Sequence, residues 1–410
     1  MKKPELLAPA GNLEKLKVAI LYGADAVYCG GHQYGLREGA DNFSLAELAE
    51  GTEFAHRYGR KIYLTVNMIP HNDDLIGLPD YLKQLQAIGV DGLIIADPGV
   101  LYFLQAEGIE LPVHLSTQAN AVNWASIRFW KEQGIERVIL ARELSQEEIS
   151  EIREKTELEL EIFIHGSNCI SYSGRCLLSN YLVNRDANRG KCAHSCRWKY
   201  YLVEEKRPGE YYPITEDEQG SYIMNSKDLC LLEYLPEIIN MGIDSLKIEG
   251  RMKSLHYVAN VTRVYRRAID AYLANPVAYR LDPLWWEELK KINQRDYTTA
   301  FFAGPPTTVD HNYHSSAYQR NFDFIGMIRE YRPEKGEATV EVRHKLVRGD
   351  LLEIIGFDGE SFTQRLDYLL NEAGEQLESA PHPRQLIRIP VDRPVQPYYL
   401  VRRERNEPRS

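Results

Sequence analysis

The stretch ELLAPAGNLEKLKVAILYGADAVYCGG, residues 5–31, decides the fold. It begins with a short apolar run at Glu5, continues through the amphipathic segment LEKLKVAILYG, and reaches a second apolar run at Asp25. The middle segment has helical periodicity and ends in Gly, as many helices do. The flanking runs are short and apolar, which is typical of buried parallel strands. This stretch therefore predicts one strand–helix–strand unit of a parallel sheet.

The same alternation continues through the first 275 residues. Strands are expected at ELLAPA from Glu5, DAVYCGG from Asp25, KIYLTVNM from Lys61, DGLIIAD from Asp91, PVHLSTQA from Pro112, ERVILAR from Glu136, LELEIFIHG from Leu158 and DSLKIEG from Asp244. Eight such units with right-handed crossovers favour a closed TIM-type βα barrel over an open doubly wound sheet. No GxGxxG motif follows the first strand to favour a dinucleotide-binding sheet.

The domain organisation follows from changes in this pattern. We predict the α/β barrel over residues 1–275, with a large cysteine-bearing insertion at 167–228 after the seventh strand. A helical connector at 276–321, which includes LDPLWWEELKKINQ, is expected to pack on the barrel. From Phe322 the alternation becomes that of short strands separated by turns, so residues 322–410 are expected to form a small all-β barrel domain.

The composition is that of a globular protein, with 44% hydrophobic and 26% charged residues among 410. A net charge of −10 argues against nucleic-acid binding over the whole surface but does not exclude a local basic patch. The first apolar run is too short for a signal peptide, and no stretch reaches the roughly eighteen apolar residues of a spanning helix. We therefore expect a cytoplasmic protein without a membrane association. In that compartment, clustered cysteines indicate metal or redox chemistry rather than disulfides.

The insertion and its end contain an unusual set of cysteines. Cys169, Cys176, Cys192 and Cys230 follow the spacing C-x6-C-x15-C-x37-C, and Cys196 lies four residues after Cys192. Four thiolates at one point suit zinc or an iron–sulfur cluster, and unligated buried thiols are a third interpretation. The wide spacing favours a cluster, because structural zinc usually binds closely paired cysteines.

Polar residues end most of the predicted strands. In TIM barrels the active site lies at these C-terminal ends. The residues are Cys29, Asn67, Asp97, Gln118, Arg142, His165, Glu249 and Arg251. Each one by itself fits a cap or turn, and Cys29 fits a small core residue, but together they predict a pocket.

The chemistry of four of these residues suggests roles. Arg142 and Arg251 could bind a carboxylate or phosphate with two hydrogen bonds each. His165 and Glu249 are the candidate proton-handling pair, although a structural hydrogen bond at a strand end is the alternative for His165. An anionic substrate is therefore expected.

The insertion also has the composition of an RNA-binding segment. Residues 175–207 contain eight Lys or Arg against three Asp or Glu, and aromatic residues are interleaved among them. These aromatic residues are Tyr172, Tyr181, Trp198, Tyr200 and Tyr201. Basic and aromatic side chains together suit a single-stranded or looped RNA, and a solvated loop over packed aromatics is the alternative. No HExxH, GxSxG or P-loop motif is present to support ordinary hydrolase or kinase chemistry.

Three motifs resemble those of the collagenase-like peptidase family U32. They are HGSNCISYSGRCLLSNYLVNRDANRGKCAHSCRW at 165–198, NSKDLC at 225–230 and IEGRMKS at 248–254. The resemblance covers nearly the whole chain, and VRGDLLEIIG in the β-rich end is similar to the tRNA-modifying branch. Despite the family name, the resemblance implies an oxygen-independent hydroxylase, which forms 5-hydroxyuridine at the tRNA wobble position in that branch. Other branches act on ribosomal RNA cytidine or on a ubiquinone precursor.

The resemblance also implies cofactors and site residues. It implies a 4Fe-4S cluster on Cys169, Cys176, Cys192 and Cys230, with Cys196 as the alternative to Cys192. It implies prephenate as the small anionic co-substrate and the tRNA anticodon loop as the partner. The other site residues come from the sequence itself and not from the resemblance: His165 and Glu249 are expected to be catalytic, and the substrate-binding residues are Asn67, Gln118, Arg142, Arg175, Lys247 and Arg251. A peptidase, a hydroxylase of another RNA or of a quinone precursor, and a non-catalytic RNA-binding protein are the alternatives.

Overall fold

The computed structural model describes residues 2–36, 41–169, 171–198, 201–202, 212–213, 227–292, 295–305, 321–359 and 361–405. The chain forms two compact units. One unit comprises Met1–Leu281 and Arg295–Ala317, and the other comprises Asp282–Gln294 and Tyr318–Ser410. No helix within the described ranges is both long and apolar enough to cross a membrane.

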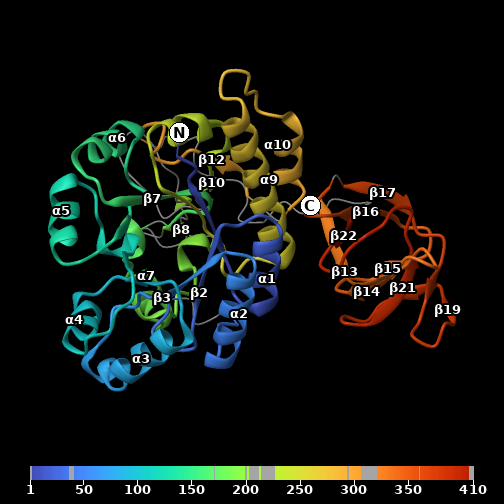
Figure 1. Ribbon diagram of the computed structural model, residues 1–410, viewed down its shortest axis with the longest axis horizontal. Coiled ribbons are helices and arrows are strands. Elements are labelled where there is room, and N and C mark those ends of the chain that lie inside the picture. The colour runs from blue at the N-terminus through green and yellow to red at the C-terminus, as the bar shows by residue number, and fades with distance from the viewer. Residues whose placement is uncertain are drawn as a thin grey trace. The chain divides into compact units, whose positions relative to one another are not determined.

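The first unit is built on a closed barrel of eight parallel strands (Figure 1). The strands are β1 Glu5–Pro9, β2 Ala26–Gly30, β3 Lys61–Val66, β4 Gly92–Ile95, β5 Val113–Leu115, β6 Arg137–Ile139, β7 Glu159–Ser167 and β11 Ser245–Ile248. Each pairs with its predecessor in this order, and β11 closes the barrel by pairing with both β7 and β1. The predicted TIM-type fold and its strands are confirmed.

Helices surround these strands in a ring (Figure 1). They are α1 Leu13–Leu21, α2 Leu45–Arg57, α3 Leu78–Ile88, α4 Pro98–Ala106, α5 Trp124–Glu132, α6 Gln146–Lys155, α8 Leu235–Asn240 and α9 Leu255–Ala274. Local sequence sets their ends. Ser44 caps α2 in a reciprocal capping box with Glu47, and Gly134 adopts a φ of 88° just after α5. Such signals are why the helical segments could be predicted from the sequence.

Two short strands extend the barrel sheet beside β7. Strand β10 (Asp228–Cys230) pairs antiparallel with the end of β7, and β12 (Tyr297–Thr298) pairs with β10. In this pairing Ser167 lies opposite Asp228. The insertion between them contains helix α7 (Leu178–Val183) and the short strands β8 (Tyr201–Leu202) and β9 (Tyr212–Pro213). Its chain therefore leaves and re-enters the barrel at the same place.

The interior of the barrel contains a buried network of charges. Glu161 is fully buried, and its carboxylate accepts a hydrogen bond from Lys247 Nζ at 2.7 Å. Arg137 donates to the same carboxylate at 3.3 Å and to Glu5 at 2.6 Å. Burial lowers the pKa of Lys247, and the Lys247 ammonium helps to hold the pKa of Glu161 low. Each buried charge thus has an opposite partner.

The second unit is the predicted C-terminal antiparallel β domain. Its main sheet has the order β17-β16-β22-β13-β14-β21-β18-β19, and β15 pairs with β20. The strands are β13 Phe322–Arg332, β14 Glu337–Val342, β15 Leu346–Val347, β16 Leu351–Ile355, β17 Phe362–Arg365, β18 Leu369–Leu370, β19 Gln376–Leu377, β20 Ser379–Ala380, β21 Leu386–Pro390 and β22 Leu400–Glu404. Apolar side chains that alternate along these strands, such as Ile325, Val340 and Ile387, form its core.

Helix α10 (Pro283–Lys290) differs from our expectation of a connector packed on the barrel, because it belongs to the β domain. The fully buried guanidinium of Arg402 explains this placement. It donates to Glu288 of α10 at 2.8 Å and to Glu353 of β16 at 2.7 Å. Two carboxylates and one buried arginine thus hold the helix against the sheet.

Candidate active site at the barrel mouth

The C-terminal ends of the parallel strands meet at one end of the barrel, which we call the mouth. On one side of the mouth, predicted polar residues contact each other directly. Asn67 after β3 donates from Nδ2 to Gln118 Oε1 after β5 at 2.8 Å, and Ser116 Oγ donates to the same oxygen at 2.9 Å. Leu36 N donates to Asn67 Oδ1 at 3.3 Å. These contacts give the Asn67 and Gln118 amides fixed directions at the mouth.

Arg142 and Glu249 meet on the opposite side of the mouth. Arg142 Nη2 lies 3.5 Å from Glu249 Oε2, and the guanidinium lies 3.6 Å above the centre of the Phe163 ring. The hydroxyl of Tyr28 lies 3.4 Å from the same Glu249 oxygen and donates to Ile248 O at 3.1 Å. A guanidinium has five N–H donors, so the long contact with one oxygen leaves Arg142 able to bind an anion.

Arg251 extends from the end of β11 toward β2 and β3. Its Nη1 donates to Thr65 Oγ1 at 2.9 Å, and the residue is only 4% exposed. The guanidinium covers Gly30, where a Cβ atom would lie 1.9 Å from Nη1. A glycine at position 30 is therefore required for Arg251 to occupy this place.

Three other sequence candidates have structural roles in the fold. Asp97 caps helix α4 by accepting from Gly99 N at 2.8 Å. Cys29 is fully buried in β2, and burial raises its pKa to about 12. Lys247 lies below the mouth in the charge network with Glu161. These placements favour the cap and core interpretations for Asp97 and Cys29, and a core ion pair for Lys247.

His165 lies among three tyrosine rings. Its ring is close to those of Tyr257, Tyr265 and Tyr297, and Nδ1 lies 3.3 Å from the Tyr265 hydroxyl. Burial lowers the pKa of His165 to about 3, so the ring is neutral at neutral pH.

A break in the strand pairing accounts for this position. The register between β11 and β7 shifts between Lys247 and Ile248, which leaves Ile248 opposite His165. A bulge of this kind changes the direction of the side chains that follow it. These contacts favour a structural hydrogen bond for His165, and the His165–Glu249 proton pair stays a prediction.

The insertion contacts loops that follow three different barrel strands. Ser173 donates from N and Oγ to Glu143 after β6, at 2.6 and 2.8 Å. Arg175 Nε donates to Gln118 O after β5 at 2.8 Å, and Arg189 pairs with Asp74 after β3 at 2.5 Å. The insertion therefore extends across the mouth, and Arg175 contacts the predicted substrate-binding residue Gln118.

The predicted cysteine ligands Cys176 and Cys192 have backbone donors at their sulfurs. Leu178 N lies 3.4 Å from Cys176 Sγ, and His194 N lies 3.4 Å from Cys192 Sγ. Backbone N–H groups that point at cysteine sulfur stabilise thiolate ligands and tune iron–sulfur clusters. The local geometry of these two residues thus fits a cluster-binding loop.

The other two predicted ligands come from the strands at the base of the insertion. Cys169 is exposed just after β7. Cys230 is buried in β10, where its sulfur lies 3.6 Å from the Tyr265 hydroxyl and burial raises its pKa to about 12. Within the described ranges, no three His, Cys, Asp or Glu side chains are gathered closely enough to hold a metal ion. The donor set fits a 4Fe-4S cluster in chemical type.

The residues that position the insertion were not found from the sequence. Asn188 Oδ1 accepts from Cys176 N, and Asn188 Nδ2 donates to Cys176 O, both at 3.2 Å. The carbonyl of Asn188 accepts from Ile69 N after β3 at 3.0 Å. Asn188 thereby connects the Cys176 turn to the barrel, and only the Asn- and Asp-rich composition of this segment indicated turns there.

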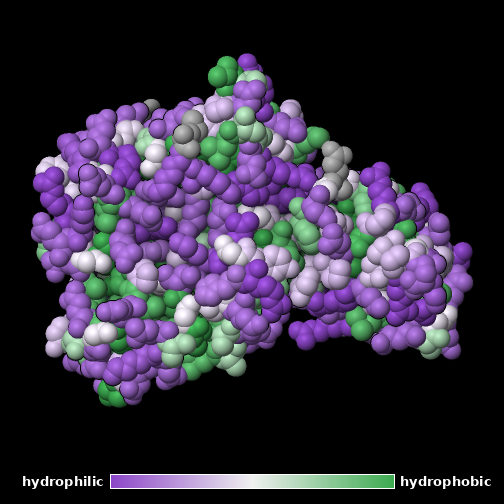
Figure 2. Space-filling model, in the orientation of Figure 1, coloured by the Kyte–Doolittle hydropathy of each residue, from purple (hydrophilic) through white to green (hydrophobic). Residues whose placement is uncertain are grey.

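The insertion exposes large apolar and aromatic side chains. Tyr181 on α7 is 86% exposed and Leu177 is 74% exposed, and Tyr172 and Trp198 are about half exposed. In contrast, hydrophilic residues dominate the face of the barrel unit shown in Figure 2. Exposed aromatic rings on a basic segment suit stacking with unpaired bases. Tyr200 and residues 203–207 of the predicted basic segment lie outside the described residues.

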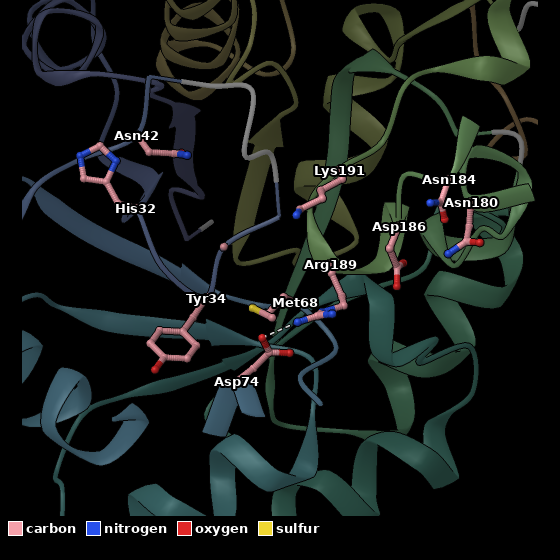
Figure 3. A pocket seen from close by; sticks show the side chains of 11 residues that line it. His32, Tyr34, Asn42, Met68, Asp74, Asn180, Asn184, Asp186, Arg189 and Lys191 are labelled. Carbon is pink, nitrogen blue, oxygen red and sulfur yellow. Dashed lines mark hydrogen bonds and ion pairs between the residues drawn. The ribbon is translucent and has the colours of Figure 1, made fainter. Parts of the chain in front are cut away.

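A pocket of about 420 Å³ lies between the insertion and the loops after β2 and β3 (Figure 3). It is lined by His32, Tyr34, Gly35, Asn42, Met68, Asp74, Asn180, Asn184, Asp186, Arg189 and Lys191. None of these residues was predicted as a site residue. Their side chains come from separate parts of the chain, so no single motif indicated the pocket.

Comparison with known families agrees with this architecture. The family model "Peptidase family U32" matches residues 11–312, and "Peptidase family U32 C-terminal domain" matches residues 320–402. The chain belongs to peptidase family U32. The first match covers the barrel with its insertion, and the second match covers the β domain.

Several family U32 relatives are similar to this chain. The tRNA hydroxylation protein P1 of Bacillus subtilis is 47% identical over 402 residues, which cover 98% of this chain and 95% of the relative. The tRNA hydroxylation protein P of Escherichia coli is 39% identical over 444 residues, with 98% and 96% covered. The 23S rRNA 5-hydroxycytidine C2501 synthase of Escherichia coli is 40% identical over 269 residues, which cover 66% of this chain and 40% of that relative.

Proposed function

We propose that this chain is an RNA hydroxylase, and specifically one that forms 5-hydroxyuridine at the wobble position of tRNA. The observation that carries the proposal is the similarity to two tRNA hydroxylation proteins over 98% of the chain. Both alignments also cover at least 95% of the relative, so the same domain organisation is shared from end to end. We further propose that the reaction uses prephenate, does not use molecular oxygen, and depends on a 4Fe-4S cluster.

The insertion supports RNA as the substrate. It extends across the barrel mouth and exposes Tyr172, Tyr181 and Trp198 on a segment rich in Lys and Arg. Aromatic rings stack on unpaired bases of any sequence, and the cations attract the phosphates. An anticodon loop offers both unpaired bases and closely spaced phosphates. The insertion would hold this loop above the mouth.

The two mouth arginines support an anionic co-substrate. Prephenate has two carboxylates, and Arg142 and Arg251 each present a planar guanidinium suited to one of them. Arg251 is held by Thr65 Oγ1 at 2.9 Å, and Arg142 lies flat on Phe163. Both guanidinium groups are therefore oriented before the ligand binds, which reduces the entropy cost of binding.

Glu249 is the proposed proton acceptor. Replacing the C5–H bond of the base with a C5–OH bond requires the hydrogen at C5 to leave, and it can leave as a proton to a nearby base. The Glu249 carboxylate lies at the mouth between Arg142 and the Tyr28 hydroxyl. A carboxylate in that position can accept the proton while Asn67 and Gln118 orient the substrate.

Cys169, Cys176, Cys192 and Cys230 would hold the 4Fe-4S cluster. When bound, such a cluster supplies electron-transfer chemistry near the mouth. The backbone donors at Cys176 and Cys192 support this assignment.

The test is nucleoside mass spectrometry of tRNA from a strain that lacks its own tRNA hydroxylation genes. We expect 5-hydroxyuridine derivatives to appear when this chain is expressed. They should fall sharply with Arg142→Lys, because lysine cannot make the same paired hydrogen bonds. The exposed Arg128 on α5 offers a matched control, and Arg128→Lys should leave the nucleosides unchanged. Unmodified tRNA at normal protein levels would refute the proposed function.

A second candidate is hydroxylation of a ribosomal RNA cytidine. It is favoured by the 40% identity to the 23S rRNA 5-hydroxycytidine synthase, although the aligned region covers only 40% of that relative. The same strains allow 5-hydroxycytidine to be measured in 23S rRNA. An increase there without any change in tRNA would favour this second function. Cleavage of gelatin by the purified protein would instead support a peptidase.

A further inference from the structure

The pocket between the insertion and the loops after β2 and β3 lies next to the mouth. Its Gly35 wall is close to Thr65, since a Cβ atom on Gly35 would lie 3.5 Å from Thr65 Oγ1. Thr65 in turn holds Arg251, and Met68 directly follows the mouth residue Asn67. A molecule in the pocket would therefore reach the edge of the proposed active site.

The two walls of the pocket are joined by specific contacts. Arg189 of the insertion pairs with Asp74 of the β3 loop, as the dashed line in Figure 3 shows. Met68 N donates to Tyr34 O at 3.3 Å. Because these contacts join separate segments of the chain, the pocket has a defined shape.

Several pocket residues have a strained backbone. Tyr34, Asn42 and Asn184 have φ values of 60°, 55° and 52°. This left-handed conformation is tolerated by asparagine but is unfavourable for a bulky residue such as tyrosine. Strain of this kind is retained where the surrounding structure requires it, and it is common at binding sites. The conformation of Tyr34 therefore supports a binding role for this pocket.

The charges in the pocket balance. Asp74 and Asp186 line it together with Arg189 and Lys191, and Arg189 is paired with Asp74. Two acids and two bases give no net attraction for a ligand with two carboxylates. The pocket thus suits a neutral molecule with a phosphate beside it.

The polar groups of the pocket suit a pyrimidine base. Asn180 and Asn184 project from α7 and its C-terminus, and Figure 3 shows their amides side by side on the insertion wall. An amide presents one donor and one acceptor, which match the edge of an imide ring such as uracil. The Tyr34 ring packs on Tyr81 with ring centres 5.1 Å apart and its hydroxyl donates to Ile76 O at 3.2 Å, so it holds the opposite wall in place. Lys191 supplies a cation for a neighbouring phosphate. A volume of about 420 Å³ is enough for one nucleoside.

We propose that this pocket receives the target pyrimidine base after it leaves the stack of the RNA loop and before the base enters the mouth beside Glu249. Asn180 and Asn184 recognise its edge, and Lys191 contacts the adjacent phosphate. The exposed Tyr181 on α7 would stack on a neighbouring base of the same loop. This inference rests on the proposed RNA hydroxylase function and adds the place where the base is bound.

The first test is photo-crosslinking, which requires no catalysis. The full-length protein is irradiated with an anticodon stem-loop that carries 4-thiouridine at the target position, and the crosslinked peptide is sequenced by mass spectrometry. We expect crosslinks to peptides that contain Tyr34 or Met68. Crosslinks confined to peptides outside the pocket would overturn the inference. Because this readout is independent of hydroxylation, it separates failure of the pocket from failure of the proposed function.

The second test uses variants that keep the backbone intact. Asn184→Gly removes the amide and is compatible with the left-handed φ, while Asn180→Ala is compatible with helix α7. The double variant should lower both the crosslink yield and the hydroxylation of the stem-loop roughly ten-fold, as expected for two lost hydrogen bonds. The exposed amide Gln84 on α3 gives the control Gln84→Ala, which should match the wild type. Wild-type crosslinking by the double variant would overturn the inference.

Discussion

The position of Arg251 over Gly30 allows a sharp test of the mouth. A Cβ atom at position 30 would lie 1.9 Å from Arg251 Nη1, whereas an ordinary contact begins near 3.4 Å. Gly30→Ala must therefore displace the guanidinium by about 1.5 Å, the difference between these two distances. The obstructing atom is the end of a flexible side chain, and Gly30 is not among the glycines with positive φ. The variant should therefore fold with little loss of stability.

Its activity should fall much more than its stability. Misplacing a positioning group by 1 Å can cost on the order of 100-fold in rate. We expect kcat/KM for prephenate, measured with the purified protein and a tRNA substrate, to fall by about that factor, mainly through a higher KM. Gly359→Ala is the matched control, because a Cβ atom there meets nothing within 4 Å. A folded Gly30→Ala protein with wild-type kcat/KM would show that Arg251 does not bind the anion.

Three further predictions concern the core, the pH response and the cysteines. Lys247→Met leaves the buried Glu161 without its closest partner, so the unfolding free energy measured in urea titrations should fall by about 3–5 kcal/mol. The double variant Lys247→Met/Glu161→Gln should recover part of this lost free energy. Burial holds the pKa of His165 at about 3, below its unfolded value of about 6.5, so the stability that depends on the neutral ring should be lost as pH falls from 6.5 toward 3. This loss is up to about 1.4 kcal/mol per pH unit, and His165→Gln should show a shallower slope; equal slopes would contradict the assignment. Anaerobically purified protein should be brown, with roughly four iron and four sulfide per chain. The Cys176→Ser variant should lose the colour, and the Cys196→Ser variant should keep it. A colourless protein that contains zinc would contradict the cluster.

Most of the fold could be predicted because its signals are local. The strand at Leu158 and the helix at LEKLKVAILYG are visible from apolar runs and period alone. Packing partners are not local in the same way. The amphipathic pattern of LDPLWWEELKKINQ predicted helix α10, but nothing in it identifies Arg402, more than a hundred residues later, as the partner of Glu288.

The site was harder to predict than the fold for a related reason. Asn67 contacts Gln118, and Arg142 contacts Glu249, because parallel strands end together, which is why strand ends were a useful guide. The direction of His165 could not be predicted, since the bulge beside Lys247 leaves no mark in the alternation of residues. The pocket was missed because it is formed only when the insertion folds back onto the β3 loop.

The pairing of Ser167 with Asp228 has a consequence for how this family diversifies. Both ends of the insertion are paired with each other at the barrel mouth. The length of chain between them therefore adds little to the entropy cost of closing the barrel. The sequence between the cysteines of this segment can then vary, and with it the choice of target, while the cysteines themselves and the barrel strands stay the same. The same strand pairing makes residues 168–227 a segment that can be exchanged as one piece between relatives that modify different RNAs.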